Sequence, residues 1–391
     1  MPEYRPNWYN GDKTPSHMRN KDLRIFVDAH CLDKEYQGTN SYVKGLYTAM
    51  MNIHPEIDIC FGAHNPENIF KAFPGKDPKV IQYRSKSQSA RLLADIPTIL
   101  KKRSFDFDHF QNIAPLGRKN CKYVLTLHDV LFEDYKEQFP LFFRKSRSFF
   151  FKKSITNAQI KTTVSTYSKQ RIALHYSIQQ NDIHVIANAG NHVRNSLSEI
   201  NHKPFKRKYD LKDYILYVSR IEPRKNHAVL IKAWKSLQLC KQGIRLVFIG
   251  HYSIYCKALE KELSRLTYHE RSMIHFLSDL PEDDLEHFYL NCRLFVYPSL
   301  AEGFGIPPIE AALYRKPVIC SNRTAMMEYD FFSPYFFNPE KVEELCSHIN
   351  TILEHPPCEN QLKSISEKVS TLYNWEKSAE QLYQLLITNC E

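Results

Sequence analysis

Short apolar runs alternate with longer amphipathic stretches along most of the chain. The first series predicts strands at 23–28, 122–127, 160–165 and 183–188. It predicts helices from about Thr39 and near 140–157. Strands rich in β-branched and aromatic residues that alternate with helices are typical of βαβ units and parallel sheets. We therefore predict a first α/β domain at 22–200, preceded by a polar tail or extra arm at 1–21.

The alternation stops near Asn191 and resumes at Tyr214. Residues 191–213 are polar and basic, which is typical of an interdomain linker. The second series predicts strands at 214–219, 244–250, 273–277, 294–297 and 317–321. We therefore predict a second doubly wound domain at 201–373. Because such sheets bind ligands at the carboxyl ends of their strands, the residues that follow each run are the first candidates for a site.

Composition narrows the class of protein. An apolar fraction of 43% in 391 residues is enough for two packed cores. No window holds the roughly 20 apolar residues that cross a bilayer, so we predict no membrane span. Ten cysteines without a C-x-x-C pair argue against zinc and suit a reducing cytosol. The net charge of +10 favours an anionic partner, of which nucleic acid is the least expected, although a plain excess of surface lysine is the alternative.

Glycine is scarce, with 11 residues in the chain, so the pair Gly303 and Gly305 is informative. The pair follows the apolar run 294–297 and precedes Pro307 and Pro308, which suit the first turn of a helix. A strand, a glycine loop and a helix start expose backbone N–H groups and the positive end of the helix dipole. We predict that a phosphate binds there.

Two acids flank this loop. Glu302 stands on its strand side, and we predict Glu310 in the first helical turn. Both can face one elongated ligand without forming a hydrogen-bonded pair. The alternative is structural: Glu310 complements the helix dipole, a contribution of about 0.3–1 kcal/mol, and Glu302 accepts from loop donors.

Cations follow the predicted strand 214–219. Arg220 comes directly after it and Lys225 shortly before the next helix, so the two can neutralise a diphosphate. The alternative is solvated surface charge, which is what we predict for Arg224. In the first domain His128 and Asp129 follow the strand 122–127. A histidine there is more often structural, but this position overlooks the cleft between the domains.

These residues resemble a known family. The segment PSLAEGFGIPPIEA resembles the E-x7-E signature of glycosyltransferase family 4, and LYVSRIEPRKNHAVLIKAW resembles its donor-diphosphate segment. Members are retaining enzymes with the GT-B fold, in which two Rossmann-like domains face a central cleft. The resemblance spans about 22–388. It implies that the terminal helix, 374–391, crosses back to complete the acceptor-binding first domain.

The resemblance also implies roles. Glu302 would contact hydroxyls of the donor sugar and Glu310 the ribose. Arg220 and Lys225 would hold the diphosphate, and His128 would lie near the sugar. The predicted catalytic residues are Glu302, His128, Arg220 and Lys225. The predicted donor-binding residues are Glu310, Gly303, Phe304, Gly305, Ile306, Gly38, Asp129 and Gly250. Retention would follow a front-face route in which the leaving phosphate helps to deprotonate the acceptor. No metal or other cofactor is expected, because the chain has no D-x-D motif at a strand end.

The predicted function is transfer of a hexose from a nucleotide diphosphate sugar, with GDP-mannose preferred, to a glycan or lipid-linked glycan in surface polysaccharide synthesis. The alternatives are a UDP-hexose transferase with a small soluble acceptor and a non-catalytic sugar-nucleotide sensor or scaffold. The aromatic and basic segment 141–154 is interpreted either as a helix on an anionic membrane or as a core helix with a solvated face. The predicted location is the cytoplasm, including the inner face of the membrane.

Overall fold

The computed structural model describes residues 23–33, 38–115, 122–190, 209 and 211–390. The predicted tail at 1–21 and most of the predicted linker lie outside these residues. The predicted boundary near 200 therefore lies outside them as well.

The first sheet is parallel throughout. Among the described residues it has seven strands in the order β3-β2-β1-β4-β5-β6-β7. Its strands are β1 Arg24–Asp28, β2 Asp58–Ala63, β3 Lys79–Gln82, β4 Phe107–Gln111, β5 Lys122–Thr126, β6 Ile160–Thr163 and β7 Ile183–Val185. Its central strands are buried on both faces, as parallel strands covered by helices are.

The second sheet is also parallel, with the order β10-β9-β8-β11-β12-β13. Its strands are β8 Tyr214–Val218, β9 Arg245–Ile249, β10 Ile274–Leu277, β11 Leu294–Tyr297, β12 Val318–Ser321 and β13 Phe336–Phe337. In both sheets the order reverses beside the first strand of the series, which is the switch point of a doubly wound fold. The predicted fold class is confirmed.

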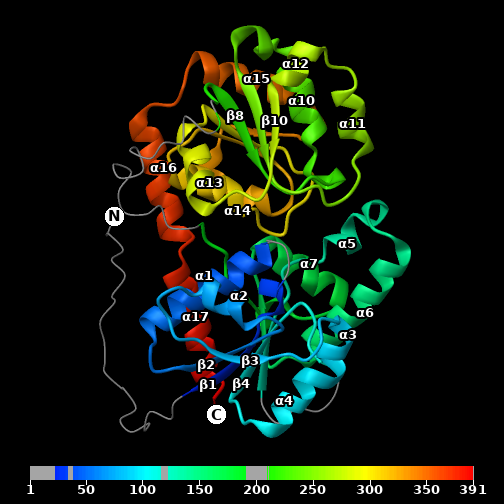
Figure 1. The fold of residues 1–391 in the computed structure, drawn as a ribbon, viewed down its shortest axis with the longest axis vertical. Helices are drawn as coiled ribbons and strands as arrows, with labels where there is room; N and C mark the ends of the chain where they lie inside the picture. The colour runs from blue at the N-terminus through cyan, green and yellow to red at the C-terminus, as the bar shows by residue number, and fades with distance from the viewer. Residues whose placement is uncertain (1–22, 34–37, 116–121, 191–208, 210, 391) are drawn as a thin grey trace, which may run out of the picture.

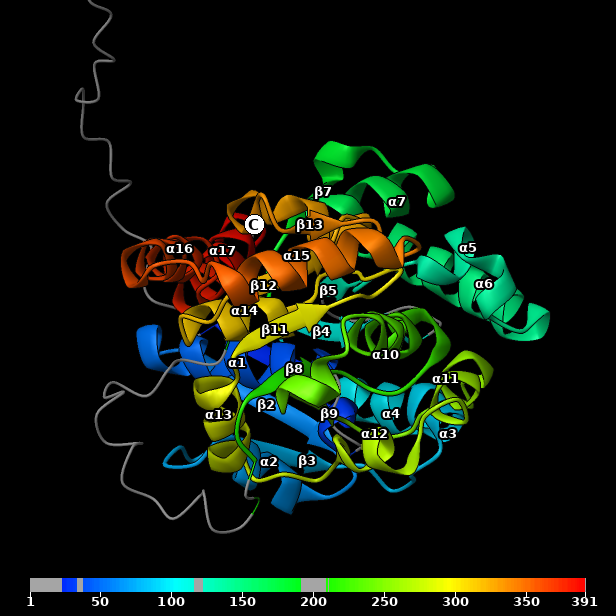
Figure 2. The same cartoon turned by 90° about the horizontal axis from the view of Figure 1, so that it is seen from above.

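Helices cover both sheets (Figure 1). Those of the first series are α1 Gly38–Ile53, α2 Pro66–Ala72, α3 Gln88–Ala90, α4 Ile96–Lys102, α5 Leu131–Asp134, α6 Leu141–Asn157 and α7 Thr166–Tyr176. Those of the second series are α10 His227–Ser236, α11 Lys257–Leu263, α12 Tyr268–Ser272, α13 Glu282–Asn291, α14 Ile306–Leu313, α15 Val342–Glu354 and α16 Glu359–Leu372. In Figure 1 and Figure 2, α6 lies at the margin of the molecule. Within the described ranges, no helix combines the length and apolar character needed to cross a membrane.

The last helix, α17 Trp375–Thr388, packs on the first domain although it follows the second in sequence. It lies beside α1 in Figure 1. A side chain at Gly45 of α1 would meet the Trp375 ring, because a Cβ built there lies 2.2 Å from Trp375 Cε2. Ser378 Oγ donates to the Ala187 carbonyl at 2.8 Å. The indole of Trp375 is therefore a packing element, as its 4% exposure requires.

The carboxyl ends of the two sheets face one another. Ser165, which follows β6, donates from Oγ to the Gly303 carbonyl at 2.6 Å, and Ser168 Oγ donates to the same carbonyl at 3.1 Å. The N–H groups of Thr166 and Tyr167, at the start of α7, donate to the Glu328 carboxylate at 3.1 and 2.6 Å. The start of α7 thus contacts the loops that follow β11 and β12.

Candidate active site

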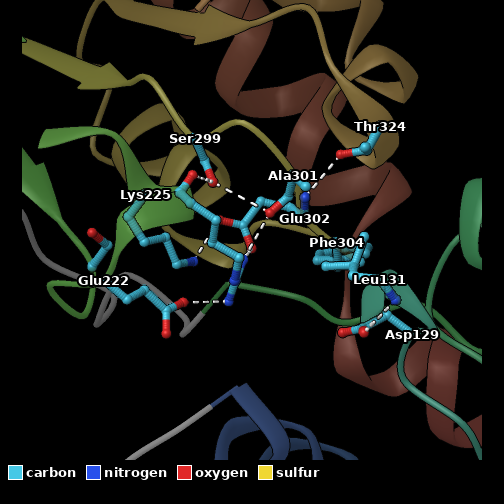
Figure 3. Close-up of polar contacts among 12 residues, drawn as sticks. Asp129, Leu131, Glu222, Lys225, Ser299, Ala301, Glu302, Phe304 and Thr324 are labelled. Carbon is cyan, nitrogen blue, oxygen red and sulfur yellow. Dashed lines mark hydrogen bonds and ion pairs between the residues drawn. The ribbon is translucent and has the colours of Figure 1, made fainter. Parts of the chain in front are cut away.

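Glu302 is held by side chains from three segments of the second domain (Figure 3). Lys225 Nζ and the Tyr297 hydroxyl donate to Oε1, the latter at 2.9 Å. Arg224 Nη1 donates to Oε2 at 3.0 Å, and the Glu302 N–H donates to Thr324 Oγ1 at 2.8 Å. Glu302 is therefore fixed in position before any ligand binds.

The charges at Glu302 compensate one another. Burial opposes ionisation of its carboxyl, but the adjacent Lys225 and Arg224 outweigh burial and lower its pKa to about 2. Burial and the neighbouring Arg224 lower the pKa of Lys225, against the opposing effect of Glu302. At neutral pH the carboxylate is charged. An anionic ligand beside it would compete with Glu302 for the cations.

The prediction that Arg224 is solvated surface charge is wrong. Its side chain is 16% exposed, and Nη1 also donates to the Ala301 carbonyl at 2.7 Å. Its Nη2 pairs with Glu222 Oε1 at 2.7 Å. Burial lowers the pKa of Arg224, but the two glutamates outweigh this effect and raise it. Arg220 is the more accessible cation of this loop, at 33% exposure, with its nearest carboxylate oxygen, on Glu222, 3.8 Å away.

In the glycine loop, Gly303 to Gly305, the carbonyl groups and the N–H groups differ in their contacts. Its carbonyl groups bind protein donors: the Tyr329 hydroxyl donates to the carbonyls of Phe304 and Gly305 at 2.7 and 3.3 Å. The N–H groups of Gly303, Phe304 and Gly305 have no partner within the part of the chain that the structure describes. Gly305 precedes α14 with a φ of 99°, which favours glycine. The loop therefore offers backbone donors at the start of α14, where Ile306 is the first residue.

Gly303 also meets the first domain. A Cβ at this position would lie 2.7 Å from Asp129 Cβ and 3.1 Å from the His128 carbonyl oxygen. Together with the bonds that its carbonyl accepts from Ser165, just before α7, and Ser168, within α7, this close approach explains why glycine is needed here. Gly303 therefore joins the two domains as well as supplying a backbone donor.

Glu310 lies deeper in α14 than predicted. The helix begins at Ile306, so Glu310 is its fifth residue and belongs to the second turn. The prediction of a first-turn position is wrong because the helix begins at Ile306, directly after Gly305, so four residues fill its first turn before Glu310. The Tyr289 hydroxyl donates to Glu310 Oε2 at 2.8 Å, and the residue is 9% exposed. Gly190 of the first domain approaches the same helix, since a Cβ there lies 2.6 Å from Leu313 Cδ1.

The remaining second-domain candidate, Gly250, follows β9. Its φ is 148°, and a Cβ there would lie 2.1 Å from the Ser219 carbonyl oxygen. Any side chain at 250 would displace the segment that leads from β8 to Arg220. Gly250 therefore packs against the backbone at the start of the loop 220–225, which carries Arg220, Arg224 and Lys225 and is called the cation loop below.

The first-domain candidates His128 and Asp129 lie across from the glycine loop, next to Gly303. His128 Nε2 lies 2.9 Å from Gln111 Oε1, and burial lowers the pKa of His128 to about 4, so the ring is neutral at pH 7. Burial raises the pKa of Asp129 although Arg224 opposes the shift, and the Leu131 N–H donates to its Oδ1 at 3.1 Å. Gly38 opens α1, but residues 34–37 before it are outside the described residues.

Several side chains that hold the candidates were not predicted. Tyr297 and Thr324 bind Glu302, Tyr289 binds Glu310, and Gln111 binds His128. Tyr297 ends β11, so position at a predicted strand end was the available signal for it, whereas Gln111 ends β4, where the polar sequence predicted no strand. No group of three or more His, Cys, Asp or Glu side chains within the described ranges is arranged to hold a metal ion.

Two glycosyltransferase family models match the chain. The family model described as Glycosyltransferase Family 4 matches residues 36–194, and the one described as Glycosyl transferases group 1 matches residues 198–369. The chain thus carries two glycosyltransferase domains, the first matching the family 4 model and the second the group 1 model. It is a glycosyltransferase, as predicted. The two matches meet in the segment that the structure does not describe.

The curated relatives include bacterial mannosyltransferases. O-antigen chain mannosyltransferase B of Escherichia coli is 28% identical over 275 residues, which cover 67% of this chain and 70% of that protein. Serotype-specific mannosyltransferase WbdA of Escherichia coli is 34% identical over 177 residues, 44% of this chain. The match spans about a fifth of WbdA, 22% of its length.

Solved structures share the fold at low identity. Anabaena Alr3699/HepE, solved in complex with UDP and glucose, superposes with a TM-score of 0.72 at 17% identity over 94% of this chain and 99% of that one. WaaG, a glycosyltransferase involved in lipopolysaccharide biosynthesis, gives a TM-score of 0.66 at 17% identity over 93% and 99%. The GT-B architecture of the chain is thereby confirmed.

Proposed function

We propose that this glycosyltransferase moves mannose from GDP-mannose to a glycan or lipid-linked glycan acceptor, with retention of the anomeric configuration. The observation that carries the proposal is the site itself. Glu302 is fixed between two cations, beside backbone N–H groups that have no partner among the described residues. The names of the relatives, O-antigen mannosyltransferases, support the choice of sugar.

The diphosphate would lie between the cation loop and the glycine loop. Lys225 would exchange part of its bond to Glu302 for a phosphate oxygen, and the more accessible Arg220 would bind from the solvent side. The N–H groups of Gly303 to Gly305, which have no partner among the described residues, would donate to the same phosphates, helped by the dipole of α14. Each charge-assisted bond contributes about 1.5–3 kcal/mol before the entropic cost of binding is subtracted.

The proposed retention follows a front-face route. Glu302 has both oxygens engaged by cations, and Asp129 accepts a backbone bond, so neither is placed as a free nucleophile. The sugar–phosphate bond would break first as Lys225 and Arg220 stabilise the departing charge. The released phosphate oxygen would then take the acceptor's proton while the acceptor oxygen bonds to the anomeric carbon on the same face of the sugar. Glu302 would orient the sugar hydroxyls.

We propose that no metal ion takes part, because Arg220 and Lys225 supply positive charge at the diphosphate. The test is transfer measured with and without 5–10 mM EDTA, a chelator excess of roughly a thousandfold over trace metal that would remove any ion bound more weakly than a structural site. Turnover reduced by EDTA and restored by Mg²⁺ or Mn²⁺ would overturn this part of the proposal.

A lipid-linked acceptor would suit α6. Its five basic residues are accompanied by no acidic residue, and Phe142 and Phe149 are 85% and 58% exposed. The helix also buries Phe151 and Ile155, so one face packs in the core while another is exposed. We propose that its exposed face contacts an anionic bilayer, each basic residue adding about 1 kcal/mol. Co-sedimentation with phosphatidylglycerol vesicles should fall for Phe142→Ser with Phe149→Ser, and phosphatidylcholine vesicles are the control.

The donor is tested by thermal shift against GDP, UDP, ADP and their mannose and glucose derivatives. Ligand at 100 times its Kd stabilises the folded state by about 2.7 kcal/mol, which is readily measured. We expect GDP-mannose to give the largest shift. A larger shift with UDP-glucose would favour the UDP-hexose alternative, and a shift without any turnover would favour a sensor. The anomer formed on methyl α-D-mannoside, read by NMR, tests retention.

A further inference from the structure

A series of buried polar side chains leads through the first domain to His128. Two of them come from β4: His109, which is fully buried, and Gln111, which is 3% exposed. Tyr47 of α1 places its hydroxyl 2.5 Å from His109 Nδ1. The Gln111 amide lies between the two imidazoles, with Nε2 3.3 Å from His109 Nε2 and Oε1 2.9 Å from His128 Nε2.

The strand register explains this arrangement. β4 and β5 pair in parallel with Gln111 opposite Thr126, so both strands end side by side. Thr126 Oγ1 lies 2.7 Å from His109 Nε2. Asn112, directly after Gln111, accepts the His128 N–H at 3.1 Å through Oδ1. The end of β4 therefore holds both the backbone and the ring of His128.

The orientation of the amide decides where the protons lie. The Gln111 nitrogen can only donate, so Nε2 of His109 accepts and its Nδ1 carries the proton, directed to the Tyr47 oxygen. The Gln111 oxygen can only accept, so Nε2 of His128 carries the proton. Burial lowers the pKa values of His109 and His128 to about 3 and about 4, which makes each a neutral imidazole with one proton.

His128 Nδ1 is then a hydrogen-bond acceptor, and within the described residues nothing donates to it. The side chain is partly exposed, and the His128 carbonyl lies against Gly303 of the donor loop. The acceptor nitrogen therefore belongs to a residue that borders the proposed donor site. A sugar hydroxyl is a chemically matched donor for it.

We propose that Gln111 is a positioning residue that holds His128 in the Nε2–H tautomer, so that Nδ1 accepts a hydrogen bond from a hydroxyl of the donor sugar. This inference rests on the proposed function, in which His128 lies beside the sugar. Gln111 itself does not touch the substrate. Its effect on transfer passes through the ring of His128.

The tautomer is measured directly by ¹⁵N NMR of histidine-labelled protein, with the His128 signal assigned from its loss in His128→Asn. We expect an unprotonated Nδ1 in the parent and in Gln111→Glu, which keeps the acceptor. Gln111→Met should give a mixture of tautomers. Gln159→Met is the control for a Gln→Met change away from the site, because Gln159, which is exposed, accepts from the Tyr123 N–H at 2.8 Å and contacts no atom of His128 among the described residues. A protonated Nδ1 in the parent, or an unchanged tautomer in Gln111→Met, overturns the proposal.

Kinetics then test the link to transfer, with GDP-mannose as donor and methyl α-D-mannoside as acceptor. We expect Gln111→Met to lower kcat about tenfold, the equivalent of about 1.4 kcal/mol, with a smaller change in KM. In a His128→Ala background the same substitution should change kcat less than about twofold, because the two residues act as one unit. A full tenfold loss in that background would place the role of Gln111 elsewhere and overturn the proposal.

The two proposals fail in different ways. Full turnover in His128→Ala would remove both the sugar contact of His128 and the role of Gln111 in transfer. If instead another nucleotide sugar gives the larger thermal shift, only the choice of donor fails. The double-mutant cycle is then measured with that sugar, and a nonadditive result still supports Gln111.

Discussion

Arg224 and Arg315 provide a controlled comparison of buried and exposed ion pairs. Each places a guanidinium nitrogen 3.0 Å from a glutamate, Arg224 on Glu302 and Arg315 on Glu359. The first pair is 16% and 8% exposed, and the second 36% and 70%. Removing one partner of a buried pair costs about 3–5 kcal/mol, because the other charge stays buried and uncompensated. An exposed pair contributes about 0–1 kcal/mol.

We therefore expect Arg224→Met to lower the free energy of unfolding by about 3 kcal/mol, and Arg315→Met by less than about 1 kcal/mol. The value for Arg224→Met is at the low end of its range because Lys225 still compensates Glu302. Two losses act in the opposite direction: the bond to the Ala301 carbonyl, and the 2.7 Å pair with Glu222, which keeps only Arg220 at 3.8 Å. Methionine is unbranched and replaces much of the arginine stem, which limits the cavity left behind.

Urea unfolding followed by tryptophan fluorescence measures both variants, since Trp234 is fully buried in α10 of the second domain. Parent, Arg224→Met and Arg315→Met are compared at pH 7 and the same ionic strength. Raising the salt concentration should reduce the small effect of Arg315→Met and leave that of Arg224→Met almost unchanged. Equal losses in the two variants would refute the reasoning that burial decides the contribution of these pairs.

Three further predictions concern the same site. Lys225→Ala should weaken GDP binding at least tenfold by calorimetry, because about 1.5–3 kcal/mol of charge-assisted bonding is lost; unchanged affinity contradicts the diphosphate assignment. Glu302→Gln should lower transfer about 10²- to 10³-fold, by analogy with removal of one transition-state contact, with GDP binding kept. The Glu302 pKa of about 2 lies below its ordinary 4.5. The ionised carboxylate therefore stabilises the folded state at pH values above the pKa of the unfolded chain, and this contribution is lost as the pH falls toward the folded pKa. The stability difference between parent and Glu302→Gln should therefore shrink as pH falls from about 5 toward 3, measured by urea unfolding.

Strand positions in the second domain could be predicted where the strands are buried on both faces, as β9, β11 and β12 largely are. Runs such as 294–297 are continuous and apolar, and β11 has these same bounds. Strand ends in turn located Lys225 and Glu302, which the fold brings into contact across 77 positions of sequence. Burial of Arg224 could not be read in the same way. It depends on the Ala301 carbonyl and on Glu302, which reach it only in the folded domain.

β4 was missed for the opposite reason. Its sequence, Phe-Asp-His-Phe-Gln, contains three polar residues, yet all five positions are buried. A central strand of a parallel sheet is expected to be apolar, so buried polar residues there need partners, and His109 and Gln111 find them on α1, β5 and the segment after it. The cost of burying these groups is offset only by the bonds they make, and those bonds end at His128. The same polarity that hid the strand from the hydrophobic pattern is therefore the reason to test Gln111 as part of the active site.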